Sequence, residues 1–142
     1  MSVQTTPHVN FPGTARDALA FYQSVFGGDL MLATYGDIGA VEDPAKANDI
    51  AFGRVTAPNG FDIMAYDVQP SKAYDPGQNP FYITMQSDNE AEVRASWKAL
   101  ATEARAVLTP LGPADFAPLY GMLTDRYGVT WIVGADTAPG SI

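Results

Sequence analysis

FGRVT at residues 52–56, followed by GFDIM at residues 60–64, returns in the same order as YGMLT at residues 120–124 and GVTWI at residues 128–132. Every matched pair of residues is 68 positions apart, with no gap between the copies. Each copy has an aromatic residue before glycine, an aliphatic residue before threonine, and a turn glycine before an apolar strand. Such self-similarity indicates an internal duplication. Two copies predict a pseudo-twofold cavity between them.

Size and composition narrow the classes of protein that fit. The chain has 142 residues, which suits one domain, and its 46% hydrophobic and 17% charged residues are typical of a globular fold. The absence of cysteine excludes disulfides and thiol catalysis and is consistent with a reducing compartment. We find neither an apolar run long enough for a membrane span nor a signal-peptide pattern at residues 1–10, so we expect a cytoplasmic protein without a membrane partner. The net charge of -8 would repel a phosphate backbone, so nucleic acid is not an expected partner.

The first half of the chain, residues 7–67, is predicted to be one module. Thr14 and Asp17 resemble a capping box at the start of a helix, and Gly27 and Gly28 end it. A Gly-, Pro- and acid-rich stretch at residues 36–48 indicates a surface loop. The predicted strands are residues 8–11, 29–35, 49–57 and 61–67, the last two around a turn at residues 58–60.

The second half, residues 80–134, repeats this order after a linker at residues 68–79. Ser87 and Glu90 form a second apparent capping box, for a helix that reaches about Ala106. A proline-rich loop is expected to run through Pro118. The predicted strands are residues 80–86, 107–111, 119–124 and 129–133. Each half therefore follows the order strand, helix, strand, strand, strand.

Alternation along the strands predicts which side chains lie away from the helices. Val9, Phe11, Ile63 and Ala65 would face the first helix, and residues 81, 83 and 85 the second. The opposite surface mixes aromatic, sulfur and polar groups, as small-molecule pockets do. The candidate ligand-binding residues are His8, Asn10, Arg54, Asp62, Met64, Tyr66, Tyr82, Tyr120 and Ile132.

The duplicated βαβββ unit resembles the vicinal oxygen chelate superfamily, which includes glyoxalase I, extradiol dioxygenases and bleomycin-resistance proteins. Three stretches are similar to its PhnB-like branch: FPGTARDALAFYQSVFGGDL at residues 11–30, FDIMAYD at 61–67 and GMLTDRYGVTWIV at 121–133. The resemblance implies an α+β fold in which two βαβββ modules form a cupped mixed β-sheet with helices on its outer face. It also implies a homodimer.

In metal-dependent members of that superfamily, ligands come from the first and last strands of each half. The resemblance places Met64 and Ile132 at the closing positions, where such enzymes carry glutamate. His8 is the only imidazole in the chain, and Asp62 is the nearest candidate carboxylate, whereas a transition metal needs three or four donors. We therefore predict no metal. His8 is a candidate general base, or else a partly buried strand histidine.

Two other side chains leave alternatives open. Arg54 either binds an anionic group on a ligand or points outward from an edge strand. Trp97 and Trp131 are expected in the core rather than as stacking platforms.

The leading hypothesis is a metal-independent small-molecule binding protein. The acidic composition and the tyrosines favour a flat cationic ligand. The alternative is a lyase, isomerase or dioxygenase with a divalent metal ion held by His8, Asp62 and water or a residue of a partner chain. A third possibility is a cavity packed shut in a protein that serves assembly only.

Overall fold

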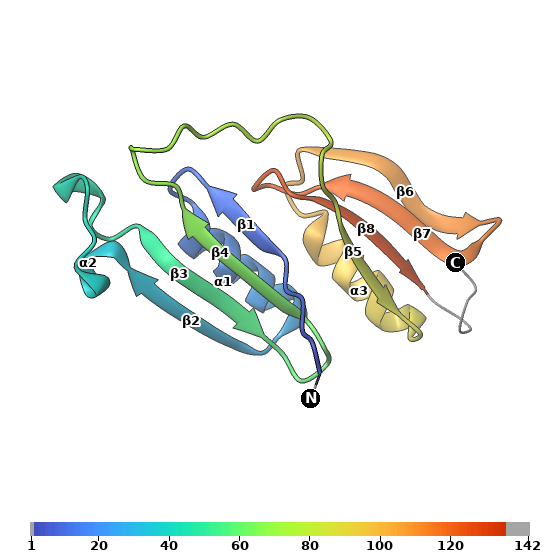
Figure 1. Ribbon diagram of the computed structural model, residues 1–142. Coiled ribbons are helices and arrows are strands. Elements are labelled where there is room, and N and C mark those ends of the chain that lie inside the picture. The colour runs from blue at the N-terminus through green and yellow to red at the C-terminus, as the bar shows by residue number, and fades with distance from the viewer. Residues whose placement is uncertain (1, 136–142) are drawn as a thin grey trace. The chain divides into compact units, whose positions relative to one another are not determined.

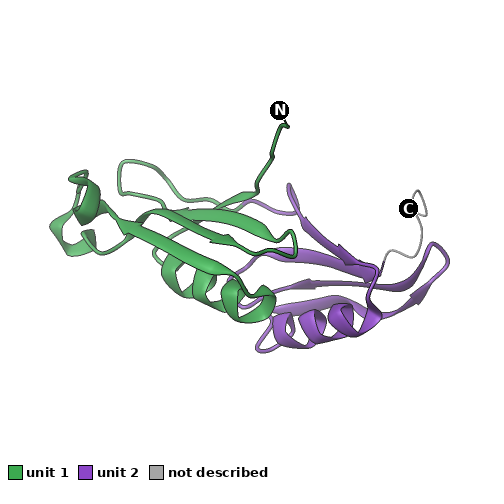
Figure 2. Cartoon of the chain, turned by 90° about the horizontal axis from the view of Figure 1, so that it is seen from below, with its two compact units in different colours: residues 1–76 green, residues 77–142 purple. Residues whose placement is uncertain are grey.

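A computed structural model describes residues 2–135 of the chain. The chain divides into two compact units at the bond between Pro76 and Gly77, which Figure 2 shows in green and purple. We describe each unit by itself. Among the described residues, no helix has both the length and the apolar character that crossing a membrane requires.

Unit 1 contains one mixed four-stranded sheet with the strand order β1-β4-β3-β2 (Figure 1). Strand β1 runs parallel to β4, and the other neighbours are antiparallel. Helix α1 lies against one face of this sheet (Figure 2). In chain order the elements are β1 (His8–Phe11), α1 (Ala15–Phe26), β2 (Asp29–Thr34), α2 (Tyr35–Ile38), the 3-10 turn η1 (Pro44–Lys46), β3 (Ile50–Thr56) and β4 (Asp62–Asp67).

Unit 2 repeats the same topology. Its sheet has the strand order β5-β8-β7-β6, with β5 parallel to β8 and the other neighbours antiparallel. Helix α3 covers one face of this sheet (Figure 2). The elements are β5 (Ile83–Ser87), α3 (Glu90–Leu100), β6 (Ala106–Ala114), β7 (Ala117–Thr124) and β8 (Thr130–Ala135). The predicted α+β fold with two βαβββ modules is therefore confirmed.

The glycine of the duplicated stretch has the same structural role in both units. A Cβ atom on Gly53 would collide with the end of the Leu19 side chain of α1. On Gly121 it would lie 2.8 Å from the Trp97 ring of α3 and 3.1 Å from the Leu111 backbone. Each helix thus packs a large side chain against bare strand backbone, which explains why both copies keep glycine at this position.

Both predicted capping boxes are wrong. Thr14 makes no capping hydrogen bond through its side chain. Instead Asp67, at the end of β4 and 1% exposed, accepts hydrogen bonds from the backbone N–H groups of Gly13, Ala15 and Ile50. In unit 2 the helix begins two residues later than predicted, because Asn89 is the residue that caps it, accepting from the N–H of Glu92.

Several boundaries also differ from prediction. The stretch predicted as a loop, residues 36–48, contains η1 and all of the short α2 except its first residue, Tyr35. Helix α3 ends at Leu100 rather than near Ala106, because Glu103 has a left-handed backbone and the Arg105 N–H already bonds to Thr124 of β7. Strand β6 is longer than expected because it is an edge strand, where proline is tolerated. The predicted proline-rich loop is therefore a tight β6–β7 hairpin.

Strand β5 begins later than predicted. Phe81 precedes it and is 88% exposed, so it does not pack beneath α3 as expected. Trp131 is fully buried, as predicted for a core residue.

Candidate functional site

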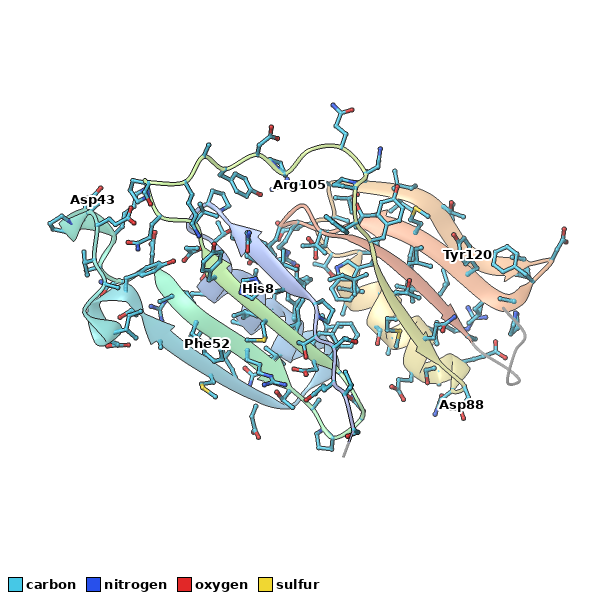
Figure 3. The ribbon with its side chains drawn as sticks, in the orientation of Figure 1. His8, Asp43, Phe52, Asp88, Arg105 and Tyr120 are labelled. Carbon is cyan, nitrogen blue, oxygen red and sulfur yellow. The ribbon has the colours of Figure 1, made fainter. Side chains whose placement is uncertain are left out.

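Six predicted residues share one face of the unit 1 sheet, the face opposite α1. Ile63 and Ala65 of β4 are buried toward α1, so the residues that alternate with them point the other way. The strand register then fixes the neighbours on this face, because His8 and Arg54 both pair with Met64. Figure 3 shows His8 on β1, in the same sheet as Phe52 of β3. We call this surface the open face of unit 1, and it carries His8, Asn10, Arg54, Asp62, Met64 and Tyr66.

At one end of the open face, His8, Asn10 and Tyr66 are in contact. The His8 Nδ1 lies 3.1 Å from the Asn10 Oδ1. An amide oxygen only accepts hydrogen bonds, so this contact is a hydrogen bond in the form of His8 that carries a proton on Nδ1. The His8 and Tyr66 rings meet edge to face, with centroids 5.0 Å apart. His8 and Asn10 are exposed and Tyr66 is half-buried, so this cluster presents aromatic surface and two polar groups.

At the other end of the face, Arg54 and Asp62 form a two-point ion pair. The Arg54 Nε donates to Oδ1 at 2.8 Å, and its second nitrogen donates to Oδ2 at 2.7 Å. Thr6 and Gln4 also donate to Oδ2, each at 2.8 Å. The hydrogen bonds from Arg54 are the main reason that the pKa of Asp62 is lowered, and the same contact raises the pKa of Arg54. The edge-strand alternative for Arg54 is wrong, since β3 is an interior strand. The guanidinium of Arg54 binds the Asp62 carboxylate.

This pairing is a poor fit to a metal site. Both oxygens of Asp62 accept hydrogen bonds, and its side chain is only 11% exposed. Met64, the neighbour of His8 on β4, offers only a thioether, which is a ligand for soft metals. Within residues 2–135, no group of three or more His, Cys, Asp or Glu side chains is arranged to hold an ion. Of the two donors proposed for the alternative enzyme, Asp62 is therefore engaged in hydrogen bonds, and His8 belongs to no group of three or more such side chains among the described residues.

Lys72 is a site residue that sequence reasoning missed. Its ammonium donates a hydrogen bond to the Tyr66 hydroxyl at 3.2 Å and lies 5.6 Å from the centre of the Tyr66 ring. Lys72 belongs to the stretch predicted as a linker, and no periodic pattern marks it. The contact between Lys72 and Tyr66 of β4 is visible only in the folded structure.

The remaining candidates belong to unit 2. Tyr120 of β7 and Ile132 of β8 lie on the face opposite α3, because the residues on either side of each of them in its own strand are buried. The Tyr120 ring, labelled in Figure 3, meets Phe116 edge to face at 4.9 Å. Tyr82 precedes β5 and donates its hydroxyl hydrogen to Asn79 at 3.1 Å. Within residues 77–135, unit 2 therefore presents apolar and aromatic groups on this face, and Met122 and Thr130 stand at the positions of Arg54 and Asp62.

Comparison with known proteins gives consistent similarities. The family described as 3-demethylubiquinone-9 3-methyltransferase matches residues 3–134. The crystal structure of protein PA1353 from Pseudomonas aeruginosa is 34% identical, with a TM-score of 0.83, over 95% of this chain and 98% of that chain. A PhnB protein from Bacillus cereus, whose description also names 3-demethylubiquinone-9 3-methyltransferase, is 26% identical, with a TM-score of 0.72, over 94% and 100%.

A more distant similarity concerns the fold alone. A glyoxalase/bleomycin resistance protein/dioxygenase from Nocardioides is 15% identical, with a TM-score of 0.57, over 99% of this chain and 88% of that chain. The similarity therefore extends over both units of the chain.

Proposed function

Because this chain belongs to the family described as 3-demethylubiquinone-9 3-methyltransferase, a PhnB-like family of the vicinal oxygen chelate superfamily, we propose that its open face binds a small aromatic molecule without a metal ion. The resemblance inferred from the sequence is thereby confirmed for family and fold. The ligand and the absence of metal are our proposal.

The observation that carries this proposal is the state of Asp62. A carboxylate that ligates a metal needs an oxygen lone pair directed at the ion. The two carboxylate oxygens of Asp62 instead accept hydrogen bonds from Arg54, Thr6 and Gln4. The matched closing positions, Met64 and Ile132, offer a thioether and a hydrocarbon. Binding by shape and aromatic contact fits these residues better than chelation.

The His8–Asn10–Tyr66 cluster supplies the contacts that such a ligand requires. Tyr66 offers a flat apolar ring, and Phe52 lies on the same face, two residues from Arg54 in β3. The Asn10 amide and the His8 Nε2 supply polar groups that orient a ligand. Methyl transfer, the activity in the family's description, would also need a site for a methyl donor, and no observation on this face favours that activity over binding.

The test is a titration with naphthamide, a flat neutral probe, followed by NMR chemical shifts. We expect shifts at His8, Asn10 and Tyr66 that persist after treatment with a chelator. His8→Ala and Tyr66→Ala should weaken binding, whereas Thr84→Ala, at the matched position of unit 2, should not. Metal analysis of protein purified without added metal should find no stoichiometric ion. A stoichiometric divalent ion that is lost in His8→Ala would instead support the enzyme alternative, and no binding at millimolar naphthamide would contradict the proposal.

We also propose that the protein is a cytoplasmic homodimer, as expected from the superfamily and from the cysteine-free composition. Light scattering after gel filtration should give twice the mass of one chain. A monomer at every concentration would contradict the dimer.

A further inference from the structure

The ammonium group of Lys72 has an unusual partner for an acidic protein. It donates to a neutral phenol, the Tyr66 hydroxyl, rather than to a carboxylate. The ion pairs Arg54–Asp62 and Arg126–Glu103 do not involve it. The Lys72 residue is exposed, so its ammonium keeps the capacity to donate further hydrogen bonds beside Tyr66. A cationic ligand would compete with this ammonium for the Tyr66 ring.

A set of hydrogen bonds fixes the chain that carries Lys72. Ser71 donates its N–H to Glu42 Oε1 at 2.9 Å and its hydroxyl to Oε2 at 2.8 Å. Gln69 accepts from the Glu42 N–H and donates to the Ala40 carbonyl, each at 3.1 Å. The Lys72 N–H closes a turn onto the Gln69 carbonyl at 2.9 Å. We call the side-chain contacts of Glu42, Gln69 and Ser71 the Glu42 clamp.

The Glu42 clamp holds the base of Lys72 while leaving its charged end at the open face. A clamp of charge-assisted and amide hydrogen bonds reduces the freedom of the segment, so less entropy is lost when Lys72 binds a ligand group. Glu42 is engaged with Ser71 and does not neutralise Lys72. The result is a positioned cation beside the Tyr66 ring, which the His8 imidazole also contacts.

We propose that Lys72 is a specificity-determining residue that binds a carboxylate on the aromatic ligand of the open face, with the Glu42 clamp as its positioning element. This inference rests on the proposed function and refines it, because it names an aromatic carboxylate as the ligand class. It replaces the expectation of a cationic ligand, which was based on composition. The Tyr66 hydroxyl and the His8–Asn10 pair lie close enough to one another to contact the same small molecule.

Three probes with one ring system test the inference: naphthoate, naphthamide and naphthylmethylammonium. We expect naphthoate to bind about fivefold more tightly than naphthamide, as for an exposed ion pair, and the ammonium compound to bind most weakly. The preference should shrink as the salt concentration rises. If naphthamide binds and naphthoate binds no better, the inference is wrong while the proposed function stands. If none of the three binds, the proposed function fails first.

Variants identify the residue that causes the preference. Lys72→Met should remove the naphthoate preference, measured as the ratio of naphthoate to naphthamide affinity in the same variant, whereas Lys98→Met, an equal charge change on α3 of unit 2, should keep that ratio. Glu42→Gln and Ser71→Ala should reduce the same affinity ratio by a smaller factor than Lys72→Met, because they loosen the base of Lys72. A preference that survives Lys72→Met would overturn the inference. Circular dichroism of each variant checks that it is folded.

Discussion

The two units have the same topology but very different residues on the face away from the helix. At four positions that the strand register equates, unit 1 has an ionisable or aromatic side chain where unit 2 has threonine, methionine or glycine. The matched pairs are His8 and Thr84, Arg54 and Met122, Asp62 and Thr130, and Tyr66 and Gly134. The duplication therefore preserved the topology of the sheet, whereas at these matched positions the ionisable side chains belong to unit 1.

The buried side shows the opposite pattern. Gly53 and Gly121 both admit a helix side chain, and Val55 and Leu123 are both buried aliphatic residues at matched positions. Packing constrains these residues because a core tolerates little change in volume. The face away from the helix carries no such constraint, so it is the surface on which function can differ between the units.

The largest expected effect comes from removing the carboxylate that ties the segments of unit 1 together. Asp67→Ala gives unit 1 the alanine that unit 2 has at the matched position, Ala135, and leaves three backbone N–H groups without their acceptor. We expect a loss of about 4 kcal/mol in the free energy of unfolding. Chemical denaturation measures it, and faster hydrogen exchange at Ile50 should accompany it.

Asn89→Ala is the matched control, because it removes the cap of α3. It should cost only about 1 kcal/mol, as for an exposed helix cap. Equal losses in the two variants would show that Asp67 is no more than a local cap.

The duplicated glycines should respond unequally to an added methyl group. Gly121→Ala should lose about 2 kcal/mol, because the Cβ would meet both an aromatic ring and backbone. Gly53→Ala should lose about 1 kcal/mol, because it would meet the flexible end of Leu19. Thermal unfolding of both variants checks the order. Leu19→Ala should rescue part of the Gly53→Ala loss, and a strictly additive double variant would contradict the predicted contact.

The Arg54–Asp62 pair should make a smaller, pH-dependent contribution that unit 2 lacks. The pKa of Asp62 is lower in the folded protein than in the unfolded chain, so its ionised form stabilises the fold above the unfolded pKa of about 3.9. That stabilisation is lost as the pH falls through the folded pKa. Asp62→Asn should therefore cost about 1 kcal/mol at neutral pH and less in acid.

Urea denaturation at neutral pH and in acid measures this difference. Asp29→Asn, an exposed aspartate at the start of β2, is the control for simple loss of a charge. A difference between wild type and Asp62→Asn that does not change with pH would contradict the role of the ion pair.

The parts of the fold that could be predicted are those that depend on local patterns. Alternation and the turn glycines identified the hairpin of β3 and β4, and helical spacing identified α1. The helix cap of α1 could not be found locally, because Asp67 lies 52 positions from Ala15. Serine and threonine are only statistically favoured near a helix start. At Thr14 the distant Asp67 binds the backbone N–H groups instead, and at Ser87 the neighbouring Asn89 is the cap.

The candidate site was predictable to the same extent. Strand alternation placed five residues of unit 1 on one face and left Arg54 open, and the register brings His8, Asn10 and Tyr66 together there. Alternation alone does not predict the ion pair of Arg54 and Asp62, because their contact depends on the register of the β3–β4 hairpin. Nor does it predict Lys72 and Glu42, because they lie in stretches without periodicity, where only the folded chain defines neighbours.

The most direct test of the central claim compares ligand contacts on the two units. Amide chemical shifts are recorded while naphthamide is added to chelator-treated protein. We predict that the changes concentrate at His8, Asn10 and Tyr66 and are absent at the matched positions Thr84, Gln86 and Gly134. Changes centred on the unit 2 positions, or binding that disappears with the chelator, would contradict the account.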